Sequence, residues 1–484
     1  MRRTPPLSRE ALIGLGADRL AELALDEAET NAAFKKLLTA ALAATAGPQA
    51  VAAIVDKRLA ALEKATGAIG SGRVRAFVED LSATLKIIVG DLAKADVDGA
   101  AARLVRLLAT ADRTFRRSQG GSDVDIAPVF RAAAAALPAL IGRLSASEAA
   151  PLADGLYALA ADSRSAILTG STPKILAVAP PGVLEALDAR LAGAIDALGP
   201  IAPGVADWSL RARGRRLIEL RQHIADVRGD VDAFIALESA LPGDVPDAAA
   251  IGERLVDAGR PREALDWLRR PAPVAIKMST MADLHVGLPP RDPTAVRRAQ
   301  VEIRALEAVG DRTAAQALRW RLFTETLDAD MLREHVARLP DFEDVDALDQ
   351  AFAAALASPL VYAALRFFMR WPRLDLAERL VVERRNDWDG QRYEALAPAA
   401  EALEPKHPLG AVLLYRALID SILARGQSLA YGHAARYYAV LEGLEAREAP
   451  DWPIEPHRHY RAELRRRHGR KYGFWSRIDQ SAHG

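Results

Sequence analysis

Apolar residues recur at helical spacing along nearly the whole chain, between breaks made by glycine and proline. An early example is "GADRLAELALDEAETNAAFKKLLTAALAATAG", residues 16–47, where Leu20, Leu23 and Ala24 fall on one face. A repeat near 3.6 residues is the pattern of an amphipathic helix, whereas alternation with a period of two would indicate strands. No Asn-Gly or Asp-Gly turn joins two alternating runs. The pattern therefore predicts an all-α protein.

The chain is too long for one compact core, because 484 residues exceed the usual size of a single domain. Residues 1–163 are predicted to form an N-terminal helical domain, a bundle whose helices are separated by breaks such as Gly47-Pro48. Residues 164–206 are rich in proline, glycine and alanine, and are predicted to be a joint with one helix at about 182–197. Residues 207–484 are predicted to form a separate helical domain.

A recurring unit marks the second half of the chain. The segments "LVDAGRPREALDWL", "LEAVGDRTAAQALRWRLF" and "ILARGQSLAYGHAARYY" each consist of a helix, a glycine turn and a second helix, and "FMRWPRLDLAERLV" is a fourth copy with Pro372 in the turn. We expect the turn glycines to adopt positive φ and the following alanines to allow close helix approach. These residues are Gly259, Gly310 and Gly426, and Ala264, Ala315 and Ala434.

The spacing of the hairpin units is irregular, unlike the period of about 34 residues of a regular tetratricopeptide array. The second half is therefore predicted to be an irregular, tetratricopeptide-like α-solenoid. Residues 269–293 contain five prolines and little periodicity. They are predicted to be either an ordered loop or a linker.

Two longer stretches carry a resemblance to a known family. "LEPKHPLGAVLLYRALID" and "RRHGRKYGFW", together with the N-terminal stretch above, resemble a bacterial all-helical family known as a domain of unknown function. The resemblance implies a tetratricopeptide-like fold and no particular activity. The C-terminal region is also similar to the helical part of bacterial SWIM zinc-finger proteins. The chain has no cysteine, so the zinc site of those proteins does not carry over.

Composition excludes several classes of function. Lysine plus arginine and aspartate plus glutamate both total 64, so the protein as a whole is not a basic coat for nucleic acid. No Gly-Lys dipeptide is present, which excludes a Walker A phosphate loop. No apolar run follows the N-terminal arginines, and "APVFRAAAAALPALIGRL" is interrupted by Arg131 and Pro138. We therefore expect a cytoplasmic protein with no membrane span, no metal and no cofactor.

Polar residues on two apolar segments of the second half form a candidate cluster. A functional interpretation gathers them into a pocket, and an enzyme would need that pocket to be an open cleft. The alternative, which we favour, is a hydrogen-bonded structural network, because buried polar groups must be paired. The residues are His407, Arg416, Asp420, His433 and Arg436.

Two further features are candidate binding sites. Asp123 and Asp125 lie two apart and could contribute to a divalent cation site, but aspartates before a helix are more often caps. Trp388, in the polar stretch "NDWDGQRY", is predicted to lie on the surface as a possible contact residue.

The C-terminal segment 457–477 contains eight basic residues and one acidic residue. One hypothesis is a nucleic-acid contact through phosphate-binding side chains and stacking aromatics. The basic residues that would make it are Arg465, Arg466, Arg467, Arg470 and Lys471. The favoured alternative is a cap, in which a helix ends at Gly469, "RKYGFW" is extended, and Phe474 and Trp475 pack against the last helices.

The leading functional hypothesis is a scaffold that binds a protein or peptide partner. Nucleic-acid binding through segment 457–477 is the second hypothesis, and an enzyme is the third. None of the three requires a cofactor.

Overall fold

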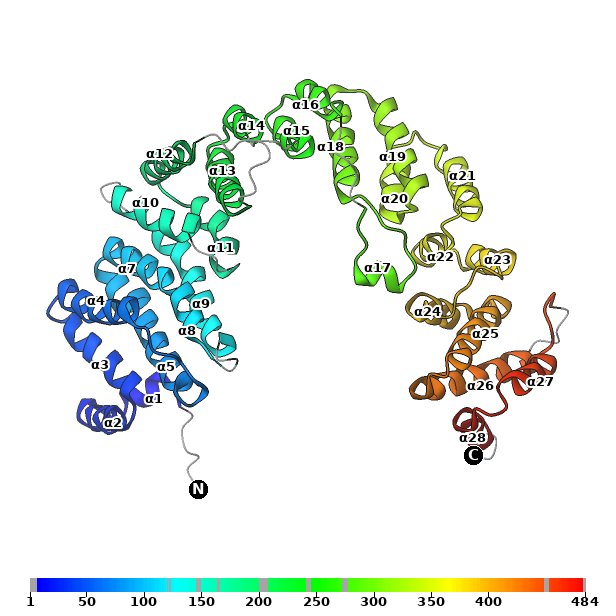
Figure 1. Ribbon diagram of the computed structural model, residues 1–484, viewed down its shortest axis with the longest axis horizontal. Coiled ribbons are helices and arrows are strands. Elements are labelled where there is room, and N and C mark those ends of the chain that lie inside the picture. The colour runs from blue at the N-terminus through cyan, green and yellow to red at the C-terminus, as the bar shows by residue number, and fades with distance from the viewer. Residues whose placement is uncertain are drawn as a thin grey trace. The chain divides into compact units, whose positions relative to one another are not determined.

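The computed structural model describes residues 7–119, 121, 123–144, 149–162, 166–199, 208–240, 245–271, 277–447 and 452–481. All regular elements in these ranges are helices (Figure 1), and extended pairing within them is limited to two isolated bridges. The predicted all-α class is therefore confirmed. The chain divides into two compact units, Met1–Pro246 and Asp247–Gly484. The domain limits predicted at residues 163 and 206 stay predictions.

Helices of the N-terminal unit begin where the sequence places capping residues. The side chains of Asn31 and Asp96 accept hydrogen bonds from the backbone N–H groups of Phe34 and Gly99, and Pro48 lies in the first turn of its helix. The described elements are α1 Arg9–Ile13, α2 Ala17–Thr30, α3 Ala32–Ala44, α4 Pro48–Lys64, α5 Ser71–Ile87, the π-helical η1 Ile88–Leu92, α6 Ala93–Ala95, α7 Val97–Ala109, α8 Ala111–Arg117, α9 Asp123–Ile141, α10 Ala149–Tyr157, the π-helical η3 Ala158–Asp162, α11 Ala166–Leu176, α12 Pro181–Leu198, α13 Trp208–Arg228 and α14 Val231–Ser239.

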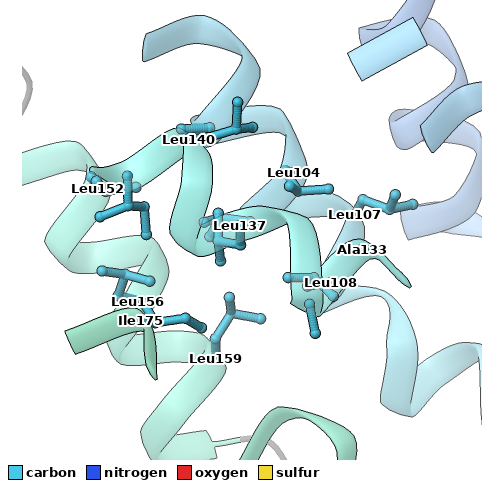
Figure 2. Packing of buried hydrophobic residues seen from close by; sticks show 14 of the residues in the cluster. Leu104, Leu107, Leu108, Ala133, Leu137, Leu140, Leu152, Leu156, Leu159 and Ile175 are labelled. Carbon is cyan, nitrogen blue, oxygen red and sulfur yellow. The ribbon is translucent and has the colours of Figure 1, made fainter. Parts of the chain in front are cut away.

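Helix α9 is central to the core of this unit. It packs against α5, α7 and α11, and its residues Ala133, Leu137 and Leu140 lie among leucines of α7 and α10 (Figure 2). By length and composition α9 could cross a membrane. Its packing also explains its apolar composition, because a core helix that is covered by several neighbours is apolar on most sides.

The described part of the predicted joint, residues 166–199, contains one helix more than predicted. In addition to α12, it contains α11, which has Pro173 in its interior. Proline removes a helical hydrogen bond. Burial of Ile175 and Leu176 against the core offsets this loss, which local sequence signals could not show.

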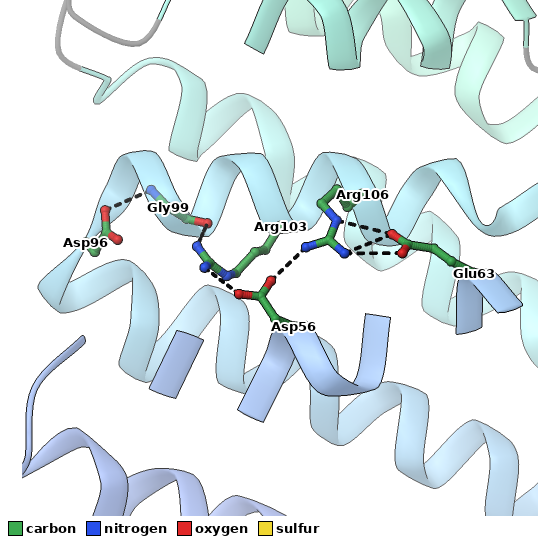
Figure 3. Close-up of polar contacts among 6 residues, drawn as sticks. All are labelled: Asp56, Glu63, Asp96, Gly99, Arg103 and Arg106. Atoms are coloured by element: carbon green, nitrogen blue, oxygen red, sulfur yellow. Dashed lines mark hydrogen bonds and ion pairs between the residues drawn. The ribbon is translucent and has the colours of Figure 1, made fainter. Parts of the chain in front are cut away.

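An ion-pair clasp joins α4 to α7 (Figure 3). Asp56 of α4 accepts from Arg103 and Arg106 of α7 at 2.7 Å each, and Arg106 also contacts Glu63 at 3.0 Å. These side chains are partly exposed, so each pair contributes only about 0–1 kcal/mol. The clasp therefore fixes the register of the two helices more than it stabilises the fold.

Helices of the C-terminal unit pack mainly on their neighbours along the chain, for example α15 on α16, α18 on α19, α22 on α23 and α25 on α26. The described elements are α15 Ala248–Asp257, α16 Pro261–Leu268, α17 Met281–His285, α18 Pro293–Val309, α19 Arg312–Thr326, α20 Ala329–Val336, α21 Asp344–Ala357, α22 Val361–Arg370, α23 Leu374–Glu383, α24 Tyr393–Leu403, α25 Pro408–Ala424, the short 3-10 turn η4 Ser428–Ala430, α26 Tyr431–Arg447, α27 His457–His468 and α28 Tyr472–Ser481.

The predicted turn geometry is confirmed. Gly259, Gly310 and Gly426 have φ of 74°, 85° and 64°, and they follow α15, α18 and α25. The three alanines expected at close helix contacts, Ala264, Ala315 and Ala434, are fully buried.

The C-terminal end differs from the prediction in one respect. "RKYGFW" is not extended, because residues from Tyr472 onward form α28. Phe474, Trp475 and Ile478 are buried, as expected for the two aromatics. The indole N–H of Trp475 donates to the His468 carbonyl at 3.0 Å, which closes the turn after α27. Burial of one face of α28 compensates for the low helix propensity of Gly473.

Candidate functional site

The predicted polar cluster is spread over three places. Arg416 and Asp420 of α25 meet Tyr460 of α27, whose hydroxyl donates to Asp420 Oδ1 at 3.1 Å. The Arg416 guanidinium lies 4.6 Å from the centroid of the Tyr460 ring, and Arg467 Nη2 is 3.7 Å from Asp420 Oδ1. This group joins α25 to α27.

The pKa shifts of Asp420 and Tyr460 are typical of a buried structural contact. Burial raises the pKa of Asp420, although Arg467 and the Tyr460 hydroxyl oppose the increase. Burial, with the nearby Asp420 carboxylate, raises the pKa of Tyr460 well above its ordinary value. Tyr460 therefore keeps its proton at neutral pH and serves as a hydrogen-bond donor.

The three remaining members of the predicted cluster have other partners. His407 precedes α25, and its Nδ1 lies 3.0 Å from Glu378 Oε2 of α23. Glu378 Oε1 also accepts from the Gly410 N–H at 3.2 Å, so these contacts anchor the start of α25 on α23. His433 and Arg436 contact each other at 3.1 Å on the exposed side of α26.

Most of the predicted nucleic-acid contacts are engaged within the chain. Arg466 and Arg467 pair with Glu463 at 2.6 and 3.1 Å, and Arg465 lies 3.8 Å from Asp479. In the part of the chain that the structure describes, Arg470 and Lys471 have no ion-pair partner. They precede Tyr472, whose side chain is 78% exposed.

A buried charged network, absent from the sequence-based candidates, lies between α18, α19 and α20. Arg319 is 1% exposed and donates to Glu307 and, at 3.1 Å, to Gln316. Arg338 also contacts Glu307, at 2.8 Å. Burial and the charge of Arg319 lower the pKa of the nearby His335. Nothing in the local pattern around Arg319 distinguishes it from the many exposed arginines of the chain.

Residues 277–292, hereafter the strap, form an ordered loop rather than a free linker. Met278 and Arg291 exchange backbone hydrogen bonds at 2.7 and 2.9 Å, which closes the base of the loop. The hydroxyl of Thr280 donates to Asp283 at 2.7 Å at the start of α17. Residues 272–276 of the predicted irregular segment lie outside the described residues.

The strap contacts elements that are distant along the chain. Arg392, just before α24, donates to the Leu284 carbonyl, and His285 Nδ1 lies 3.2 Å from Glu394 of α24. Leu288 is 3% exposed and belongs to the apolar core of the C-terminal unit. Figure 1 shows the loop that carries α17 reaching toward α24, consistent with the contact between these two helices.

An aromatic pair lies under the strap. A Cβ built on Gly287, which has φ of 73°, would be 2.8 Å from Cγ of Tyr362. The Tyr362 ring packs edge-on to Trp388, with 5.5 Å between ring centroids. Trp388 is buried and donates to the Val381 carbonyl at 3.1 Å, so the predicted surface position was wrong. The polar residues around it fold over the ring, which composition alone could not show.

One charged side chain of the strap attracts Arg366 of α22, and another repels it. The hydrogen bond from Thr280, with the charges of Arg291 and Arg366, lowers the pKa of Asp283 despite some burial. Arg366 of α22 is half-buried, and burial together with the neighbouring Arg291 lowers its pKa. Asp283 therefore provides negative charge beside two arginines.

Metal chemistry finds little support in the described ranges. They contain no group of three histidine, aspartate or glutamate side chains that could hold a metal ion. Asp123 and Asp125 lie in the first turn of α9, where carboxylates interact favourably with the helix dipole.

These features define an all-helical protein of short packed helices. The sequence matches the Family of unknown function (DUF6880) over residues 2–477, and the chain belongs to this family. The match confirms the predicted resemblance to a domain of unknown function. No curated protein matches the chain.

Proposed function

We propose that the protein is a cytoplasmic, tetratricopeptide-like scaffold that binds a protein or peptide partner. The observation that carries this proposal is the packing order of residues 247–484, in which most helices contact neighbours in the sequence. Such stacking builds one continuous core and leaves a long surface for binding. The turn glycines and buried alanines of the hairpins support the same arrangement.

The strap and α24 offer the best candidate contact area in this unit. The side chains of Met278, Met281, Leu284 and Tyr393 are exposed, and Tyr393 is next to Glu394, which holds the strap. Exposed apolar and aromatic side chains beside charged groups are common at protein interfaces. A partner would therefore contact this area first.

Site-specific photo-crosslinking in the source cell tests the scaffold proposal. A photoreactive phenylalanine analogue replaces Tyr393 in the full chain. The matched control carries it at Phe342, an aromatic position in the loop after α20 that is even more exposed, at 92% against 59%. We expect a discrete adduct with one protein from position 393 and none from position 342. Absence of a specific adduct at position 393 would count against this surface as a scaffold.

Nucleic-acid binding is the second candidate, favoured by Arg470 and Lys471, which have no ion-pair partner among the described residues and precede the exposed Tyr472. Binding of single- and double-stranded oligonucleotides is measured by fluorescence anisotropy at two salt concentrations. Arg470→Ala with Lys471→Ala should weaken binding and reduce its salt dependence. Arg466→Ala is the control, because Arg466 already pairs with Glu463. Equal effects of both changes, or no binding at low salt, would exclude this function.

A further inference from the structure

The strap departs from the packing order of the C-terminal unit. It follows α16 and precedes α18, yet α17 contacts α24, and the hydrogen bond from Arg392 to the Leu284 carbonyl joins residues 108 positions apart. A simple connection between α16 and α18 would require none of these contacts. The strap is therefore seated on a surface formed by α22 and α24.

The contacts resemble those by which a surface recognises a peptide. Arg392 binds a main-chain carbonyl, Glu394 faces His285, and Leu288 is buried among apolar side chains. Main-chain hydrogen bonds combined with a buried side chain are the usual means of peptide recognition. Main-chain hydrogen bonds do not distinguish one side chain from another, so part of the specificity must come from charge.

Charge and shape supply that specificity. Glu394 on α24 matches His285 at 3.2 Å, and the charge of Arg366 on α22 favours a carboxylate at position 283, where the Asp283 side chain accepts from Thr280. Close contact with the Tyr362 ring requires a residue without a side chain at position 287. The surface thus selects an acidic residue, then a basic or histidine residue, then glycine followed by leucine.

We propose that this face of α22 and α24 is a binding site for a short peptide with the pattern Asp-Leu-His-Val-Gly-Leu, and that residues 283–288 occupy it as an internal ligand. The inference rests on the proposed scaffold function and names its partner class. A partner peptide of this chemistry displaces the strap. Because the tethered strap competes at an effective concentration on the order of millimolar, the intact protein binds such peptides weakly.

A peptide added in trans tests the proposal. The probe is a fluorescein-labelled peptide with the sequence of residues 279–291, and its control has aspartate in place of the leucine at position 288. The protein is the full chain, as wild type and with Leu288→Asp, which removes the buried anchor of the strap. Asp283→Lys is a second releasing variant. It reverses a charge outside the core, so it keeps the test valid if Leu288→Asp does not fold.

We expect the releasing variants to bind the probe at least about tenfold more tightly than the wild type, because a larger fraction of sites is open. Adding Arg392→Ala or Glu394→Lys should abolish this gain, and the control peptide should not bind. Folded variants that bind the probe no better than the wild type would overturn the inference. If the adduct at Tyr393 nevertheless forms, the scaffold function stands and only the internal-ligand proposal fails.

Discussion

Replacing Glu307 by alanine should destabilise α18–α20 far more than an ordinary surface change. Arg319 is 1% exposed, and Glu307 is the carboxylate that its guanidinium contacts. Its second acceptor is the neutral amide of Gln316 at 3.1 Å. In the described part of the chain, Arg319 Nε has no acceptor. Glu307→Ala therefore leaves a buried cation with a single neutral partner.

Removing one partner of a buried ion pair costs about 3–5 kcal/mol. The Glu307 side chain is about one-third exposed, so water can reach part of the site, and we expect the lower end, about 3 kcal/mol. Arg319→Met removes the buried charge itself. The Glu307 carboxylate that remains is about one-third exposed and still pairs with Arg338 at 2.8 Å, so Arg319→Met should lower the free energy of unfolding by no more than about 1 kcal/mol. In the double variant, Arg319→Met should cancel most of the cost of Glu307→Ala.

Hydrogen exchange measured at increasing denaturant, on peptides covering α18–α20, gives the local free energy of opening. Glu325→Ala is the matched control, since Glu325 lies on the exposed side of α19 and its pair with Arg321 spans 3.9 Å. The control should cost less than about 0.5 kcal/mol. The reasoning is refuted if Glu307→Ala and Glu325→Ala have similar effects, or if Arg319→Met costs as much as Glu307→Ala.

Three further predictions concern other sites. Gly390→Ala should lower the free energy of unfolding, measured by denaturation, by about 3 kcal/mol or more, because its Cβ would lie 2.0 Å from the Ala417 carbonyl oxygen. The control Gly443→Ala has open space around the added Cβ and should be neutral or stabilising. Burial lowers the pKa of His335, so the unfolded chain binds a proton that the folded chain does not. The stability of α18–α20 should therefore decrease as pH falls below about 6.5. His335→Gln should remove this part of the pH dependence without removing that of the carboxylates. Phe474 is fully buried, so Phe474→Ala should lower the free energy of unfolding by about 3–5 kcal/mol and increase hydrogen exchange of residues 472–479. Unchanged exchange would contradict its role as an anchor of α28.

Features that depend on local physics could be predicted from the sequence. Helical periodicity identified the all-α class, and glycine identified the turns after α15, α18 and α25, because positive φ is a property of one residue. Burial of Phe474 and Trp475 was also predicted, since the last pair of stacked helices needs a cap over its apolar side.

Features that depend on contacts between distant residues could not be predicted in the same way. Trp388 is surrounded by polar residues in the sequence, yet its loop folds so that the indole N–H reaches Val381. His407 directly precedes the apolar helix α25, but the side chain that it contacts, Glu378, belongs to α23, 29 positions earlier. Helical spacing shows which residues share a face, and it does not show which helix covers that face.

The strap changes how the C-terminal unit should respond to perturbation. In a stack of helices that contact only their neighbours, a change in α18–α20 is felt mainly by adjacent helices. The strap joins the start of α18 directly to α24 through Arg392 and Glu394, so it adds a connection across the stack. Releasing it with Asp283→Lys should therefore increase hydrogen exchange in the strap and at the start of α24, while α27 keeps its protection through the Tyr460–Asp420 contact. Increased exchange throughout residues 247–481 would instead show that the strap is a structural brace, which a partner peptide could not displace without unfolding the site.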